Sequence, residues 1–161
     1  MKSLILVRHA KSSHTLGVST DFERPLNDRG FREAAEMGSK LFQSNIQIDL
    51  FISSPALRAK TTAELFVAQY NGKQKDIVLI PDLYNAGQND FLHAVGGFDD
   101  TCNNVALFSH NPGITDFAAS LTNTKIDHMP TCSVFAVSCD IDSWTGFAMA
   151  AKKFLFFYKP V

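Results

Sequence analysis

This sequence has few cysteines and no large excess of charge of either sign. Its 161 residues include three cysteines, and 15 basic against 16 acidic residues leave a formal net charge of -1. Cys102, Cys132 and Cys139 are odd in number and have no C-x-x-C spacing, which argues against a disulfide framework and a structural zinc site. The balanced charge offers no electrostatic footprint for nucleic acid or a membrane surface. We therefore expect reduced thiols, a cytoplasmic location, and neither nucleic acid nor a membrane as partner.

Long apolar runs are missing as well. The longest runs fall far short of the ~20 residues that a membrane span needs, and Arg8 interrupts the first run before the core of a signal peptide forms. The chain also shows no internal repeat, low-complexity tract or interdomain linker. A chain of this length can bury most of its apolar surface in one core. We expect a single domain over residues 1–161.

What the sequence does contain is an alternation of short apolar runs and amphipathic segments. The apolar runs are typical of strands buried in a parallel sheet, and they lie at residues 3–7, 48–52, 77–80 and 105–109. Apolar residues recur at helical spacing in four segments, at residues 28–42, 56–66, 89–95 and 114–121. Asn27 is the expected N-cap of the first helix, and Ser54, followed by Pro55, that of the second.

The C-terminal part has a different pattern. Residues 133–138 and 147–150 are predicted to form a pair of strands, and residues 154–158 either pack over the sheet or contact a partner. The whole order predicts an α/β fold, a three-layer α/β/α sandwich around a mostly parallel central sheet.

Polar side chains directly follow several predicted strands. Arg8 and His9 follow the first strand, Arg58 lies soon after the second, and His110 comes just after the strand at residues 105–109. Ligands of open α/β sheets bind outside the carboxyl ends of the strands, so we expect these side chains to form a site. Two arginines and two imidazoles could hold and accept a phosphoryl group. Taken singly, Arg8 and His9 could also begin a polar surface loop, and Arg58 could form a structural salt bridge.

The surroundings of these residues restrict the chemistry further. Neither a glycine-rich phosphate loop nor a carboxylate cluster for magnesium lies near them, so we expect a site with no metal and no cofactor. Residues 12–24, which include His14 and Gly17, are predicted to form a polar loop over the mouth of the site, with His14 solvated.

The segment from Leu6 to Ala10, Leu-Val-Arg-His-Ala, resembles the signature of the histidine phosphatase superfamily, which includes the phosphoglycerate mutases. Further motifs resemble its small phosphohistidine phosphatase branch, the SixA type. They extend over nearly the whole chain, at Arg8 to Ser12, Arg24-Pro25-Leu26, Arg29-Gly30, Ser53-Ser54-Pro55, Arg58-Ala59, Thr61-Thr62, Leu83-Tyr84 and Ser109 to Pro112.

This resemblance implies a phosphoglycerate mutase-like fold and a role for each of four residues. His9 would be the nucleophile that becomes phosphorylated, and Arg8, Arg58 and His110 would form the phosphate pocket. Neighbouring cations would lower the pKa of His9 and keep it neutral, while a backbone carbonyl could hold its other N–H. His110, if protonated, would add a third positive donor.

One position departs from the pattern of the larger superfamily. Mutases and many phosphomonoesterases in it carry a general-acid carboxylate in the loop after the third strand, whereas here the only carboxylate of that loop, Asp82, precedes Leu83-Tyr84. Acid catalysis is worth roughly 10²–10⁴-fold, so an enzyme without it needs a good leaving group. The resemblance thus implies a metal-independent phosphatase that acts on phosphohistidine in proteins or on another substrate with a good leaving group. A small-metabolite phosphomonoesterase and a non-catalytic phosphate-binding module are the alternatives, and the oligomeric state stays open.

Overall fold

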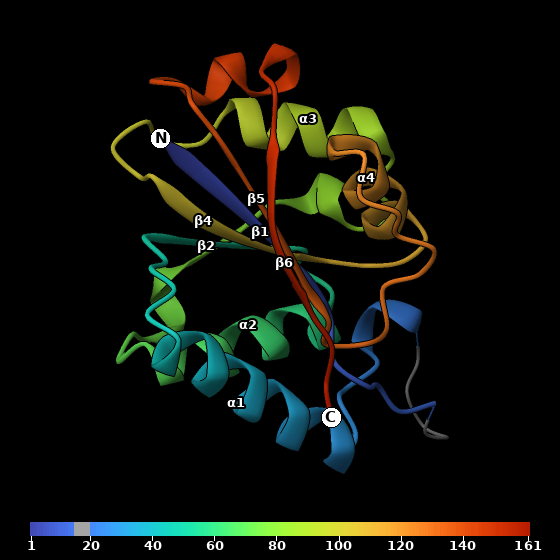
Figure 1. Cartoon of the computed structure of the whole chain (residues 1–161). Coiled ribbons are helices and arrows are strands. Elements are labelled where there is room, and N and C mark those ends of the chain that lie inside the picture. Colours follow the sequence, from blue (N-terminus) through green and yellow to red (C-terminus); the bar gives the residue numbers. More distant parts are fainter. Residues whose placement is uncertain (15–19) are drawn as a thin grey trace.

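The computed structural model of the protein describes residues 1–14 and 20–161. Within these residues six strands form one sheet in the order β3-β2-β4-β1-β5-β6 (Figure 1). The first four strands of this order run parallel to one another, and β5 runs antiparallel to both β1 and β6. The strands are β1 (Lys2–Arg8), β2 (Leu50–Ser53), β3 (Ile77–Leu79), β4 (Asn104–Ser109), β5 (Val134–Cys139) and β6 (Lys153–Tyr158).

Helices cover both faces of the sheet, as the pattern of runs predicted, so the three-layer fold is confirmed. In Figure 1, α1 and α2 lie on one face, and α3 and α4 lie on the other. The α-helices are α1 (Asp28–Gln43), α2 (Leu57–Gln69), α3 (Gln88–Gly96) and α4 (Gly113–Leu121). Short 3-10 turns form at η1 (Asp21–Glu23), η2 (Gln74–Asp76), η3 (Pro81–Leu83) and η4 (Trp144–Met149).

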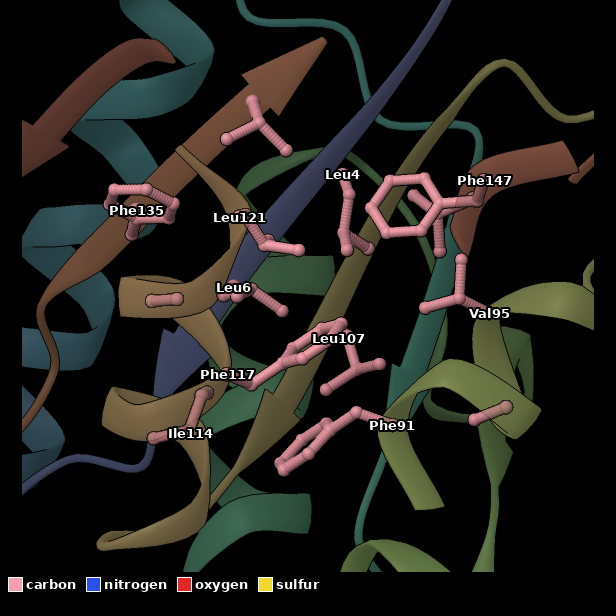
Figure 2. Packing of buried hydrophobic residues seen from close by; sticks show 14 of the residues in the cluster. Leu4, Leu6, Phe91, Val95, Leu107, Ile114, Phe117, Leu121, Phe135 and Phe147 are labelled. Carbon is pink, nitrogen blue, oxygen red and sulfur yellow. The ribbon is translucent and has the colours of Figure 1, made fainter. Parts of the chain in front are cut away.

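The core consists of two layers, one on each face of β1. Leu4 and Leu6 belong to the layer under α3 and α4, and the alternate residues of β1 belong to the layer under α1 and α2. Figure 2 shows the first layer, in which Phe91 of α3 stacks on Phe117 of α4 with ring centroids 4.9 Å apart. Burial of a large apolar side chain stabilises a fold by about 1.5–3 kcal/mol. The side chains of β1 are buried on both of its faces, so the strand is firmly held where Arg8 and His9 come.

Two predicted elements differ from the structure. The strand predicted at residues 147–150 is the end of η4 instead, where Phe147 is buried against Trp144 and Met149 is 94% exposed. The second strand of the C-terminal pair is β6, so the segment at residues 154–158 forms the edge of the sheet. An apolar run of four residues fits a strand or a helical turn equally well, and here the packing of Phe147 decides between them.

The N-terminus of α1 confirms the predicted cap, whereas that of α2 does not. The Asn27 side chain accepts a hydrogen bond of 2.9 Å from the backbone N–H of Gly30. Helix α2 begins two residues after Pro55, at Leu57, because Ala56 is extended (φ -58°, ψ 138°) and has no side chain that could cap. The Ser54 hydroxyl still accepts from the N–H of Ala56 at 3.2 Å.

The connections that leave β1 and β4 run to opposite faces of the sheet. These two strands are parallel neighbours, but the chain continues from β1 to α1 on one face and from β4 to α4 on the other. Where the connections diverge in this way, a crevice forms outside the carboxyl ends of the strands. Arg8 is the last residue of β1, His9 directly follows it, and His110 directly follows β4.

Candidate active site

The backbone places the two histidines side by side. Arg8 pairs with Ser109 in the β1–β4 register, and the N–H of His9 donates to the carbonyl of Ser109 at 3.1 Å. The rings of His9 and His110 therefore lie with their centroids 5.1 Å apart. Both residues are nearly buried, with 6% and 8% of their surface exposed.

The structure determines which nitrogen of His9 carries the proton. Its Nδ1 lies 2.8 Å from the carbonyl oxygen of Ala10, and because a carbonyl only accepts, Nδ1 must donate. In a neutral ring the lone pair then lies on Nε2. Burial, together with the charges of Arg58, Arg8 and Arg24, lowers the pKa of His9 to about 3 and outweighs the opposing effect of the Ala10 carbonyl. His9 is neutral at neutral pH, as expected.

His110 is held by the loop that follows β2. Its Nε2 lies 2.8 Å from the hydroxyl of Ser54, and its buried Nδ1 has no hydrogen-bond partner among the described residues. Burial is the largest cause that lowers the pKa of His110 to about 3, and the neighbouring His9 and Arg58 contribute to this shift. The expected positive charge on His110 is therefore absent from the free site at neutral pH. A neutral His110 can still donate one hydrogen bond from Nδ1 if Ser54 donates to Nε2.

The two predicted arginines approach from different elements. Arg8, at the end of β1, donates from Nη1 to the carbonyl of Met129 at 3.0 Å, and its buried Nε has no partner among the described residues. Arg58 lies in the first turn of α2 and is 6% exposed. Thr62 ties this helix to the loop after His9, because its hydroxyl accepts from the N–H of Ala10 at 2.9 Å and donates to the carbonyl of Arg58 at 2.8 Å. The structure thus brings together all four predicted site residues.

Sequence reasoning missed the carboxylate of this site. Asp21 of η1 receives two hydrogen bonds from Arg58, one on its backbone carbonyl at 2.7 Å and one on Oδ2 at 3.0 Å. The hydroxyl of Tyr84 donates to the same Oδ2 at 2.7 Å, and Arg24 donates to Oδ1 at 2.7 Å. These contacts lower the pKa of Asp21, with the Tyr84 bond as the largest cause, so Asp21 is an anion at neutral pH. The one local signal was the i,i+3 spacing of Asp21 and Arg24.

These side chains line a polar cavity of about 430 Å³. Its described lining holds four cationic side chains and one carboxylate, so it favours an anion. The lining residues are Arg8, His9, Lys11, Ser12, His14, Asp21, Arg24, Arg58, Asn85, His110, Asn111 and Thr131. Arg24 also donates to the hydroxyl of Ser12, which joins the two ends of the loop predicted to cover the mouth.

Other predictions for this region have mixed outcomes. His14 is exposed, as predicted, but it lines the cavity and lies 3.4 Å from Arg24. Gly17 lies outside the described residues. Asp82 is exposed on η3 and lines another cavity, beside α3, instead of this one.

Among the residues that the structure describes, no helix is long and apolar enough to cross a membrane. No group of three or more His, Cys, Asp or Glu side chains in that part of the chain is placed to hold a metal ion.

Sequence comparison gives matches of moderate identity. An uncharacterized protein of Mycobacterium leprae is 29% identical over 121 residues, which cover 73% of this chain and 72% of that protein. An uncharacterized chloroplastic protein of Arabidopsis thaliana is 26% identical over 89% of this chain and 69% of its own length. A 2,3-bisphosphoglycerate-dependent phosphoglycerate mutase of the same plant is 38% identical, over 48% of this chain and 23% of the mutase.

Solved structures share the fold at low identity. A SixA protein from Agrobacterium tumefaciens superimposes with a TM-score of 0.83 at 23% identity, over 99% of both chains. The protein histidine phosphatase SixA in complex with tungstate gives 0.78 at 21% identity, over 98% of this chain and 97% of that one. A mycobacterial glucosyl-3-phosphoglycerate phosphatase gives 0.67 at 15% identity, over 96% and 97%. These likenesses show that the fold is phosphoglycerate mutase-like.

The sequence model of one family covers the first half of the chain. It matches residues 4–87, the stretch that contains most of β1, the Arg8-His9 pair, Asp21 and all of α2 with Arg58. The residues that line the cavity from the N-terminal half thus lie inside the matched region. The chain belongs to the histidine phosphatase superfamily, branch 1.

Proposed function

We propose that the protein is a metal-independent phosphatase that works through a phosphohistidine intermediate on His9. The observation that carries this proposal is the hydrogen bond from His9 Nδ1 to the carbonyl of Ala10, which leaves the lone pair on Nε2 in a ring that is neutral at neutral pH. A neutral imidazole in a cavity lined by cations is suited to attack a phosphoryl group. A protein that only bound phosphate would not need this lone pair.

In the proposed first step, Nε2 of His9 attacks phosphorus and the bond from phosphorus to the leaving nitrogen or oxygen breaks. The electron pair stays on the leaving atom, which takes a proton. Arg8, Arg58 and the Nδ1–H of a neutral His110 bind the phosphoryl oxygens, where the charge of the transition state lies. In the second step water attacks phosphorus, the bond from phosphorus to Nε2 breaks, and its electron pair returns to Nε2. A proton of the water passes to solvent, so inorganic phosphate and neutral His9 result.

The preferred substrate is phosphohistidine in a protein, or another phosphorylated compound with a good leaving group. Support comes from the carboxylates, because the one that lines the described cavity, Asp21, is held as an anion by three side-chain donors. Asp82, in the loop where mutases carry their acid, lies outside the lining. A phosphoramidate nitrogen can take its proton from water, whereas an alkoxide leaving group needs a positioned acid. The high TM-scores with SixA structures are in accord with this choice.

Trapping of the intermediate tests the proposal. Wild-type protein mixed with a ³²P-labelled phosphohistidine protein and quenched in base should carry a label that is stable to base and lost in acid. His9→Gln should carry none, while His93→Gln, which changes an exposed histidine of α3, should label normally. Tungstate binding without label or turnover would indicate a phosphate-binding module. Faster turnover of sugar phosphates than of phosphohistidine would indicate a metabolite phosphatase.

A further inference from the structure

Asp21 is the point at which three elements of the site meet. Its backbone carbonyl and its carboxylate both accept from the Arg58 guanidinium, and the carboxylate also accepts from Tyr84 and Arg24. We propose that Asp21 is a positioning residue, which fixes the guanidinium of Arg58 in the orientation that binds the phosphoryl group. This inference deepens the proposed function and rests on it for the role of Arg58.

The location of Arg58 explains why it needs such a partner. A cation in the first turn of a helix is opposed by the helix dipole, and a long arginine side chain has many rotamers. Its side chain is only 7% exposed, so its charge needs a hydrogen-bonded partner close by. Asp21 supplies an acceptor to each terminal nitrogen, Nη1 and Nη2. Three of the five N–H groups of the guanidinium then stay available for a phosphoryl group.

The cavity leaves open space for a phosphoryl group beside the bonded Arg58–Asp21 pair. Arg58 still lines an open space of about 430 Å³ together with Arg8, His9 and His110 while both of its bonds to Asp21 are made. The Asp21 side chain is 51% exposed, so it holds Arg58 from the mouth of the cavity. These observations favour a supporting role over one in which Asp21 must leave before substrate binds.

Tyr84 in turn holds Asp21. Its hydroxyl donates to Oδ2, the atom that also accepts from Arg58, and its ring meets Phe22 edge-on at 5.3 Å and His110 edge-on at 5.6 Å. The carboxylate is therefore oriented from two sides. The same donors keep it ionised, so Asp21 has no proton to give to a leaving group. A positioning role and an acid role make opposite predictions about the leaving group, and this difference can be measured.

A double-mutant cycle between Asp21 and Arg58 tests the inference. Asp21→Asn keeps the shape and the backbone acceptor but removes the charge, and we expect it to weaken kcat/KM by about 10- to 100-fold, the range for contacting groups. In an Arg58→Ala background the same substitution should change kcat/KM by less than about twofold. Tyr84→Phe should show a smaller loss that also disappears in Arg58→Ala. Asp82→Asn, an exposed carboxylate outside the cavity lining, is the matched control and should behave as wild type.

The dependence on the leaving group separates positioning from acid catalysis. The Asp21→Asn loss should be the same factor for every member of a series of substituted phenyl phosphates. A loss that grows as the phenol becomes more basic would make Asp21 an acid and overturn the inference. Additive effects in the cycle would also overturn it, because Asp21 would then act independently of Arg58.

Tungstate affinity, measured by calorimetry on the same four proteins of the cycle, does not depend on turnover. Coupling between Asp21 and Arg58 in tungstate binding, in a protein that hydrolyses nothing, would retain the inference and refute the proposed function. Turnover by the wild type with no coupling in either assay would support the proposed function and refute the inference. Circular dichroism and thermal unfolding of each variant identify any that fail to fold, in which case Tyr84→Phe, which removes one hydroxyl, takes the place of Asp21→Asn in the cycle.

Discussion

Lowering the pH from 7 to 5 should destabilise this protein through its two site histidines. Burial lowers the pKa of both His9 and His110 in the folded state to about 3, whereas an unfolded chain has a histidine pKa of about 6.5. The unfolded state therefore binds more protons between these values, so stability is fully present above pH 6.5 and is lost as the pH falls toward 3. Over the interval from pH 7 to pH 5, proton linkage gives a loss of about 2 kcal/mol for each histidine.

Two such groups together amount to about 4 kcal/mol, a large part of the 5–15 kcal/mol that stabilises an ordinary domain. Aspartate and glutamate have ordinary pKa values of about 4, so they contribute little above pH 5. Urea unfolding at pH 7, 6 and 5, in buffers free of phosphate, measures the effect. The double variant His9→Gln/His110→Gln is the control, and its stability should change much less over the same interval.

The double variant also provides the result that would refute the reasoning. If it loses as much stability as the wild type between pH 7 and pH 5, the dependence comes from groups other than the buried imidazoles. If the wild type shows no dependence, His9 and His110 are not held neutral by burial. Histidine NMR spectra of the folded protein provide an independent check, because the His9 and His110 ring signals should not titrate above pH 5.

Two more predictions concern the loop after β1 and the leaving group. Gly30→Ala places a Cβ 2.1 Å from the carbonyl oxygen of Lys11, so we expect a loss of about 1–3 kcal/mol in urea unfolding and a lower kcat, whereas Gly96→Ala, with open space around it, should not destabilise. Rates across substituted phenyl phosphates should fall steeply as the phenol becomes more basic, and Asp82→Asn should leave this slope unchanged. A shallow slope that steepens in Asp82→Asn would identify Asp82 as the acid.

The parts of the fold that could be predicted are those encoded locally. The buried run before Arg8 predicts a central strand because only a strand covered on both faces has no polar alternation. Asn27 caps α1 as predicted because its side chain reaches an N–H three residues away, within one turn of chain. The ends of β1 and β4 then bring His9 and His110 together through strand pairing alone.

The parts that could not be predicted depend on contacts between distant residues. Asp21 meets Arg58 across 37 positions and Tyr84 across 63, and nothing in the local sequence around Asp21 indicates either partner. Ser54 matches the pattern of an N-cap, yet its hydroxyl contacts His110, 56 positions away, and the helix starts later. The residues that support the site, Asp21 and Ser54, therefore could not be predicted from one sequence. The residues they contact, Arg58 and His110, could be.

The charges of the site bear on which reaction it can perform. The carboxylate of Asp21 forms an ion pair with Arg58, so these two side chains together add little net charge to the cavity. Arg8, Arg24 and Lys11 then remain as the net positive charge of the described lining, against two neutral imidazoles. A phosphoryl dianion would fit this balance, and phosphorylation of His9 leaves the negative oxygens in place, so the pocket that binds the substrate also stabilises the proposed intermediate. If Asp21 positions Arg58, as proposed, the described cavity lining has no carboxylic acid left to protonate the leaving atom. The proposed substrate preference then depends on the leaving group itself.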